Sequence, residues 1–439
     1  MTVTVRQRPE HRISDLKARM YSPLCGLVTT AGYTIRGASD ARAFVAGAQL
    51  CGVHILNGQP PPNEGGYHIG GSGFMPFEPE IRVYAEAAER YCGALGGALG
   101  RDTRRFGTRS DLDGDSSPVT EASFLRLYDE EHRGPFHPYS DDATLTWIRA
   151  PKVGGGFLWV PAQYIFLGYR IRREVGEPWI QAAFSTGTAV HGTVERAIEA
   201  SLLEIVQIDA TMGHWYGTVD PVELVPDSRV SRLTGVMGRY LRRDASRYRF
   251  FRLPSADLPG FVVACLRQTS DRSVPRVAVG LGADLSLERA MYKALLEVLG
   301  VASLAEWTYI KARVSGQGLK GTSAMFDVDS NVAHYAALDD GYVESRFASG
   351  RSSRTSKVED DIIPDGSPAE FLTRAFVRTG KRLVHFDLTT DDVASLGFVA
   401  TRLWSPEVLS LAYPSAPPNL HPRFADYGGF RESRPHPYP

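Results

Sequence analysis

The chain has 439 residues, of which 43% are apolar and 23% charged, and its net charge is −1. These values are typical of a globular protein with a large core, divided among one large domain or two or three smaller ones. The balanced charge gives no global basic field for nucleic acid or for an anionic membrane surface, and no apolar run approaches the ~18 residues that span a bilayer.

The N-terminal residues 1–15 are polar and lack the apolar segment of a secretory signal, so we expect a loose segment and a cytoplasmic protein. The cysteines Cys25, Cys51, Cys92 and Cys265 are widely spaced and form no CxxC pair. This pattern indicates free thiols in a reducing compartment, and not a disulfide framework or a zinc site.

Short strands are predicted over Ser22–Ile35 and Val53–Leu56, and Ala41–Leu50 fits either a strand or a short helix. The following segment Gly65–Gly73 (GGYHIGGSG) is predicted to be a turn. Glycines before a helix can admit phosphate to backbone N–H groups, but no Gly-Lys-Ser/Thr follows, as a P-loop would require. An ordinary turn is the simpler interpretation.

The first acidic helix is predicted over Glu80–Leu95, which is rich in good helix formers. Within it, Glu86, Glu89 and Arg90 follow one another at i, i+3 and i+4, so they lie on one face. A charged surface loop comes next, and then a short helix is predicted over Phe124–Glu131.

A hairpin is predicted over Leu145–Pro161, around three consecutive glycines. Farther along, the small-residue loop Ser185–Gly192 leads directly into Thr193–Ala210, a predicted helix that is apolar on nearly every face and therefore buried. Glu204 and Gln207 lie three residues apart on one face of this helix. A buried carboxylate requires a partner, and the candidates are an arginine, a lysine or a metal ion.

Two helices that each carry a polar i, i+3 pair could enclose a cation site. Oxygen ligands suit Mg²⁺ or Ca²⁺ better than zinc, and Mg²⁺ with few carboxylates completes its shell with water and phosphate oxygens, which points to a nucleotide. Helical glutamates are more often solvated or paired internally, so the spacing alone favours that second interpretation.

A third helix is predicted over Leu285–Leu299, with Glu297 near its end, and an amphipathic helix over Ser367–Thr379. Strands are predicted at Val384–Asp387 and Phe398–Trp404, among others. The mixture of helices and strands predicts an α/β protein.

The chain ends in Pro435-His-Pro-Tyr-Pro439. Alternating prolines remove backbone donors and prevent helix, so this segment is predicted to be a stiff polyproline-II arm with a free carboxylate at its tip. Such an arm can be inserted into a site at little entropic cost. The commoner alternative for a proline-rich terminus is a disordered tail.

Five motifs in this order resemble the YcaO family over nearly the whole chain. They are Glu86-x-x-Glu89-Arg90, Ser185-Thr-Gly-Thr-Ala189 followed by Leu202–Ala210 (LLEIVQIDA), the helix around Lys293–Glu297, the segment His385–Leu411 (HFDLTTDDVASLGFVATRLWSPEVLSL), and a terminal PHPYP similar to the PxPxP tail of the azoline-forming branch. The departures are Gln207 for a family glutamate, Ile208 for an arginine and Gly300 for a glutamine. These changes leave open a partly degenerate or scaffold-only subunit.

The resemblance implies an α/β, YcaO-type fold with mixed sheets packed with helices around a central ATP and Mg²⁺ site. It divides the chain into a flexible segment over 1–18, a catalytic domain over 19–425 and a proline-rich tail over 426–439 that enters the active site. The implied activity is ATP-dependent cyclodehydration, in which a Cys, Ser or Thr side chain of a ribosomally made peptide attacks the preceding backbone carbonyl. ATP phosphorylates the resulting oxygen, phosphate leaves, and an azoline ring remains.

The resemblance also assigns roles to residues. Those implied to bind Mg²⁺ are Glu86, Glu89, Glu204 and Gln207; those implied to contact the nucleotide are Ser185, Arg90, Gln207 and Glu297; and those implied to act in catalysis are Glu86, Glu204 and the carboxylate of Pro439, which serves as a base or positions the substrate.

The implied partners are a precursor peptide, a leader-binding protein related to ubiquitin-activating enzymes, and a flavin (FMN) dehydrogenase that oxidises azolines to azoles. Because the chain starts almost directly at the catalytic domain, the leader-binding protein is expected to be separate. Homodimerisation is common in the family. The competing hypotheses are a YcaO enzyme that makes thioamides or amidines, and a non-catalytic binding subunit. The PHPYP tail argues against the first of these.

Overall fold

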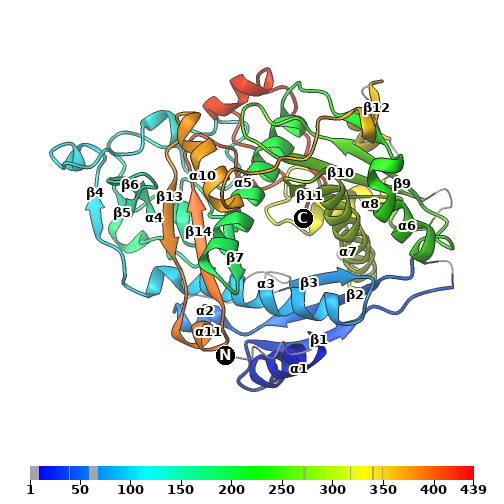
Figure 1. Cartoon of the computed structure of the whole chain (residues 1–439). Helices are drawn as coiled ribbons and strands as arrows, with labels where there is room; N and C mark the ends of the chain where they lie inside the picture. Colours follow the sequence, from blue (N-terminus) through cyan, green and yellow to red (C-terminus); the bar gives the residue numbers. More distant parts are fainter. Residues whose placement is uncertain are drawn as a thin grey trace.

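The computed structural model describes residues 9–38, 40–58, 68–269, 273–316, 318–338, 341–348 and 350–439 (Figure 1). Its strands form four sheets. One sheet has the order β1-β2-β3, another β4-β5-β6, a third β13-β14-β7 and the largest β11-β10-β9-β8-β12. All pairs are antiparallel except β12 with β8. The strands are β1 Val28–Tyr33, β2 Phe44–Leu50, β3 His68–Gly73, β4 Arg104–Gly107, β5 Leu145–Pro151, β6 Phe157–Pro161, β7 Thr188–His191, β8 Val222–Val225, β9 Arg247–Arg252, β10 Phe261–Gln268, β11 Val277–Asp284, β12 Ser352–Arg354, β13 Val384–Asp387 and β14 Val399–Trp404.

Helices join these sheets, and three long ones connect them most extensively. The helix α3 packs on β2 and β3, α5 packs on β7, β14 and β11, and α7 packs on β10, β11 and β3. In Figure 1, α3 runs across the lower part of the molecule, and α5 and α7 lie on opposite sides of its centre. The helices are α1 Pro9–Met20, α2 Val53–Leu56, α3 Phe77–Leu95, α4 Ala162–Ile165, α5 Val194–Tyr216, α6 Ser231–Tyr240, α7 Leu287–Val314, α8 Ser330–Ala337, α9 Tyr342–Phe347, α10 Pro368–Arg378 and α11 Asp391–Ser395.

The largest sheet packs closely against α7 because glycine replaces a side chain at the contact. All eight residues of β11 are buried. A Cβ atom on Gly280 would lie 2.1 Å from the backbone nitrogen of Val298 on α7. Only glycine therefore permits β11 and α7 to pack this closely. The close packing fixes the position of α7, which carries Glu297, against β11.

The helix α5 is buried along most of its length, as predicted from its apolar residues. Thr193 caps its N-terminus by accepting a hydrogen bond from Arg196 N–H at 3.3 Å. A different carboxylate of α5 has an arginine partner: Asp209 is fully buried and lies 2.7 Å from the guanidinium of Arg423. Tyr427 Oη also donates to Asp209 at 2.7 Å. This paired charge ties the C-terminal segment to α5.

Four local predictions are wrong. The segment Val53–Leu56 forms the helix α2 and not a strand. Residues 68–73 form β3 because pairing with β2 outweighs the weak strand propensity of glycine; residues 65–67 lie outside the described part of the chain. Only a 3₁₀ turn at Ala122–Phe124 occurs where a helix was predicted over Phe124–Glu131.

The fourth concerns the N-terminus, where a loose segment was expected. Residues Pro9–Met20 form α1, because Ile13, Leu16 and Met20 bury one face of this helix. Residues 1–8 lie outside the described ranges. None of the helices in the described part of the chain combines the length and the apolar character that crossing a membrane requires. The mixed α/β architecture itself is confirmed.

Candidate active site

Four glutamates from three helices face a common region. Glu86 and Glu89 come from α3, Glu204 from α5 and Glu297 from α7. Their charges interact: Glu204 and Glu86 raise the pKa of Glu89, and the same two residues raise the pKa of Glu297. The structure therefore brings together the glutamates that the sequence singled out on three separate helices.

Three of these carboxylates are held by a backbone amide from another element. The N–H of Gly70 on β3 donates to Glu86 Oε2 at 3.0 Å, and the N–H of Leu281 on β11 donates to Glu297 Oε1 at 3.1 Å. The N–H of Gly187 donates to Glu204 Oε2 at 3.1 Å. Each bond orients a carboxylate through one oxygen without neutralising its charge.

Burial and mutual repulsion make these groups strong proton or cation acceptors. Burial raises the pKa of Glu204 to about 7 and that of Glu297 to about 8, although the amide bonds act in the opposite direction. Burial together with the charge of Glu204 holds the pKa of Glu89 well above its usual range. Glu89 has no hydrogen-bond or ion-pair partner among the described residues. A bound cation would relieve this repulsion.

Two arginines provide positive charge at the site. Arg90 Nη2 lies 3.4 Å from Glu86 Oε1 one turn earlier on α3, as the i, i+4 spacing predicted. Arg402 on β14 was not predicted, although one basic residue in an otherwise apolar strand is a recognisable signal. It is 1% exposed, and its guanidinium donates to Phe184 O at 2.7 Å and to Thr188 Oγ1 at 3.0 Å.

The charge of Arg402 acts on the carboxylates. Burial lowers the pKa of Arg402 to about 10, while Glu204 and Glu89 oppose this effect. The Nε atoms of Arg402 and Arg90 are buried and have no hydrogen-bond partner among the described residues. Buried donors of this kind suit an anionic ligand such as phosphate.

The loop that contains Ser185 supports Glu204. Gly187 has φ +82°, and a Cβ atom there would lie 2.3 Å from Leu403 O, so both conformation and space require glycine. The backbone oxygen of Ser185 accepts the N–H of Thr188 at 2.7 Å. The segment Ser185–Gly192 leads directly into α5 as predicted, but its residues Thr188–His191 form β7, which pairs with β14.

Gln207 lies one turn beyond Glu204 on the same face of α5. Its side chain is partly exposed and makes no hydrogen bond to another described residue. The amide oxygen is consequently available to a ligand, at lower charge than a glutamate would offer.

The donor set fits Mg²⁺ bound together with phosphate better than a cation held by protein alone. Within the described part of the chain, no three His, Cys, Asp or Glu side chains lie close enough to hold a metal ion by themselves. Mg²⁺ commonly takes one or two carboxylates and completes its shell with water and phosphate oxygens. Carboxylates on three helices, each with one oxygen tied to an amide, match that requirement.

The C-terminal arm is inserted into the protein. Pro435, His436, Pro437 and Tyr438 are buried, and the backbone oxygens of His436 and Tyr438 each accept a hydrogen bond from Asn331 Nδ2 on α8 at 2.7 Å. Trp215 Nε1 on α5 donates to Arg434 O at 3.0 Å. The disordered-tail alternative is therefore wrong for this segment.

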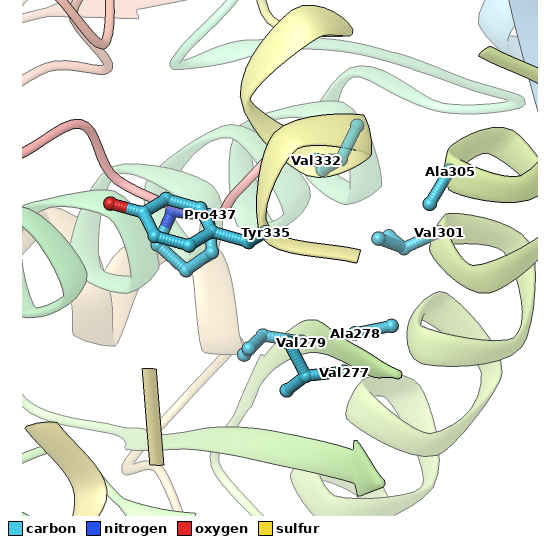
Figure 2. Close-up of a pocket in the computed structure, with 8 residues that line it drawn as sticks. All are labelled: Val277, Ala278, Val279, Val301, Ala305, Val332, Tyr335 and Pro437. Carbon is cyan, nitrogen blue, oxygen red and sulfur yellow. The ribbon is translucent and has the colours of Figure 1, made fainter. Parts of the chain in front are cut away.

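The arm approaches the site along α7 and β11. Figure 2 shows Pro437 in a small cavity lined by β11, α7 and α8, including Val279 and Val301. Val301 is one helical turn beyond Glu297, and Val279 is two residues before Leu281, whose amide holds Glu297. In Figure 1 the C terminus lies near the centre of the molecule.

The shifted glutamates predict a pH effect on stability. Glu297 titrates near 4.5 in the unfolded chain and at about 8 in the folded one, so between these values the folded state keeps a proton that the unfolded state has lost. Its contribution to stability is therefore lost as the pH rises from about 4.5 to about 8. We expect Glu297→Gln to raise the melting temperature relative to the wild type by an amount that grows over this range. Thermal melts at pH 5, 6, 7 and 8 test this, and a difference that does not change with pH would contradict it.

The family model for YcaO cyclodehydratases, described as ATP- and Mg²⁺-binding, matches residues 70–409. Comparison with curated proteins gave no match. A solved heterocyclase in complex with substrate and cofactor is 16% identical, with a TM-score of 0.70 over 92% of this chain and 53% of its own. The chain thus spans about half the length of that protein.

Two further structures match nearly along their whole length. YcaO from Methanopyrus kandleri, bound with AMPPCP and Mg²⁺, is 16% identical, with a TM-score of 0.60 over 92% of this chain and 91% of its own. A chain of the E. coli microcin synthetase McbBCD complex is 12% identical, with a TM-score of 0.61 over 94% of this chain and 98% of its own. These likenesses confirm the predicted fold.

Proposed function

This chain belongs to the YcaO family of ATP- and Mg²⁺-binding cyclodehydratases, and from that premise we propose that it forms thiazoline or oxazoline rings from Cys, Ser or Thr in a ribosomally synthesised peptide. The observation that carries the proposal is the buried PHPYP arm, whose Pro437 lines a cavity together with Val301, the residue one helical turn beyond Glu297. A buried arm of this kind is consistent with the azoline-forming branch, whose PxPxP tail the PHPYP segment resembles.

Bound Mg²⁺ and ATP would supply the phosphoryl group that turns an amide oxygen into a leaving group. We propose that Glu86, Glu89, Glu204 and Gln207 would hold Mg²⁺ together with water and phosphate oxygens, with one or two of the carboxylates binding the metal directly and the others acting through bound water. Arg90, Ser185, Gln207 and Glu297 contact or orient the nucleotide, and Arg402 adds a fixed positive charge behind Glu204 and Glu89.

The carboxylate of Pro439 is proposed as the proton acceptor for the attacking side chain or the amide N–H, or as a group that positions the substrate. The neighbouring Tyr438 is fully buried, which supports the proposal that the arm is held close to its terminal residue. The proposed domain division remains a catalytic domain over 19–425 and a tail over 426–439.

A non-catalytic subunit is the second candidate, and Gln207 favours it because an amide contributes less charge to Mg²⁺ than a glutamate. Ile208 also removes an arginine that family members carry. A thioamide- or amidine-forming activity receives less support, since the buried arm would then have no role.

We further propose that the protein acts with partners. The similarity to a chain of the microcin synthetase complex, also solved with pro-MccB17 bound, supports function within an assembly that takes a precursor peptide. The proposed partners are a separate leader-binding protein related to ubiquitin-activating enzymes, an FMN-dependent dehydrogenase and a second copy of this chain.

The test is mass spectrometry of a precursor peptide after incubation with this protein, its leader-binding partner and Mg-ATP. We expect the peptide to lose the mass of one water for each ring. The loss should not occur when AMPPCP replaces ATP, because phosphoryl transfer is then blocked. ATP binding without any change in peptide mass would support the non-catalytic candidate instead.

A further inference from the structure

Four arginines gather around a hollow on the surface, away from the glutamates. The hollow has a volume of about 280 Å³, and Gly238 and Tyr240 complete its lining. The arginine patch consists of Arg42, from the connection between β1 and β2, and Arg239, Arg242 and Arg243, from the end of α6 and the turn after it; all four are exposed. Arg42 N–H donates to Tyr240 O at 2.7 Å, which ties the two segments together.

The arginine patch lacks acidic ion-pair partners in the part of the chain that the structure describes. None of its four side chains forms an ion pair with a described residue, whereas exposed arginines elsewhere do, such as Arg126 with Asp141. Two acidic residues in the same segments accept backbone hydrogen bonds and form no ion pair with the four arginines. Gly37 N–H donates to Asp40 at 2.5 Å, and Ser246 N–H donates to Asp244 at 2.8 Å. Unpaired positive charges of this density favour an anionic ligand.

The patch is connected to the glutamate site through β3. The ring of Tyr240 packs against Phe74, with centroids 4.8 Å apart. Phe74 directly follows β3, and Gly70 on the same strand holds Glu86. Four residues of strand span ~14 Å, so an extended peptide of about four residues covers the same length.

We propose that the arginine patch binds an acidic segment of the precursor peptide, a few residues away from the residue that reacts. This inference rests on the proposed function. Guanidinium groups match carboxylates with two parallel hydrogen bonds. The patch is confined to one hollow and does not form the long basic stripe that tracks a nucleic-acid backbone, so a short acidic peptide fits it better.

A binding assay tests the proposal without any need for ring formation. The probe is a fluorescein-labelled peptide with six glutamates, and its twin has six glutamines. With the full chain at low salt, we expect fluorescence anisotropy to show at least tenfold tighter binding of the glutamate peptide, with the preference falling as salt is added. The triple variant Arg239→Glu, Arg242→Glu, Arg243→Glu should lose this preference, whereas Arg313→Glu, at an exposed arginine on α7, should keep it.

A second variant keeps the charges and fills the hollow. A side chain at Gly238 would meet no atom within 4 Å of its Cβ, and leucine suits a helix better than glycine. Gly238→Leu should therefore fold and still weaken binding of the glutamate peptide by about fivefold. Unchanged binding in both variants, or tighter binding of a single-stranded oligonucleotide than of the glutamate peptide, would overturn the proposal.

A kinetic experiment tests whether the acidic segment belongs to the precursor peptide. In an assembly that forms rings, the triple variant should raise KM for the precursor and leave kcat unchanged, and a precursor with its acidic residues changed to Gln or Asn should show the same rise. If the triple variant weakened only the binding of the leader-binding partner, the proposal that the patch binds the precursor would be wrong. Failure of ring formation in every sample would count against the proposed function and leave the anisotropy result standing.

Discussion

Glu204→Gln is expected to lower the rate of ring formation by at least ~100-fold. Glu204 is the one glutamate of α5 in the site, and its charge acts on both Glu89 and Glu297. Glutamine keeps an oxygen that can accept the N–H of Gly187, so the loop geometry should survive. The measurement is the rate of water loss from the precursor at saturating ATP, with Mg²⁺ varied to detect weaker metal binding.

Glu195→Gln is the matched control, because it makes the same change on the same helix at an exposed position. This control should retain full activity. Glu204→Gln should also be at least as stable as the wild type without nucleotide, because it removes one of several repelling charges. A loss of activity accompanied by a lower melting temperature would indicate structural damage and not loss of a metal ligand, and normal activity would contradict the assigned role.

Adding one glycine after Pro439 is expected to reduce ring formation by about 100-fold while leaving the melting temperature unchanged. The extension moves the terminal carboxylate by one residue but leaves Tyr438 in place. Deleting Pro437–Pro439 should abolish activity as well. That deletion also removes the fully buried Tyr438 ring, which packs edge-on against Trp215 with centroids 5.9 Å apart, so it should cost about 3–5 kcal/mol of stability.

The two tail variants therefore separate chemistry from packing. Comparing the melting temperature and the rate of water loss for both shows which property depends on the carboxylate. Nucleotide binding, followed by calorimetry with Mg-AMPPCP, should remain within about twofold of the wild type in the glycine-extended variant. Full activity of that variant would exclude a role for the terminal carboxylate and leave the arm with a structural function.

Local sequence patterns were sufficient for the long helices and for the residues that share a helix face, whereas the roles of the glutamates came from the family resemblance. Glu86, Glu89 and Arg90 share a face because helical spacing requires it, and α5 is buried because nearly all its faces are apolar. The spacing could not show that these faces turn toward one another. That depends on how three sheets orient three helices, and no local pattern encodes it.

The residues that hold the glutamates in place could not be predicted from the sequence. Gly70, Gly187 and Leu281 bind the glutamates through backbone N–H groups, which every residue except proline has. The residue type at Leu281 therefore gives no signal, and a glycine, as at Gly70 and Gly187, has several other common explanations. The glycine-rich segment Gly65–Gly73 is predicted from the sequence to be a turn, whereas Gly70 belongs to the strand β3. Tertiary pairing overrides the preference of glycine for turns at this position.

The three amides that hold the glutamates also determine when the site can form during folding. They belong to β3, to the loop before β7 and to β11, which are far apart in sequence and lie in three different sheets. Contacts between such distant segments form late, because closing the long intervening loops costs entropy before the contacts stabilise the chain. A nascent chain that has not yet added β11 to its sheet holds Glu297 in no defined orientation. We therefore expect the proposed nucleotide affinity to arise only once the fold is complete.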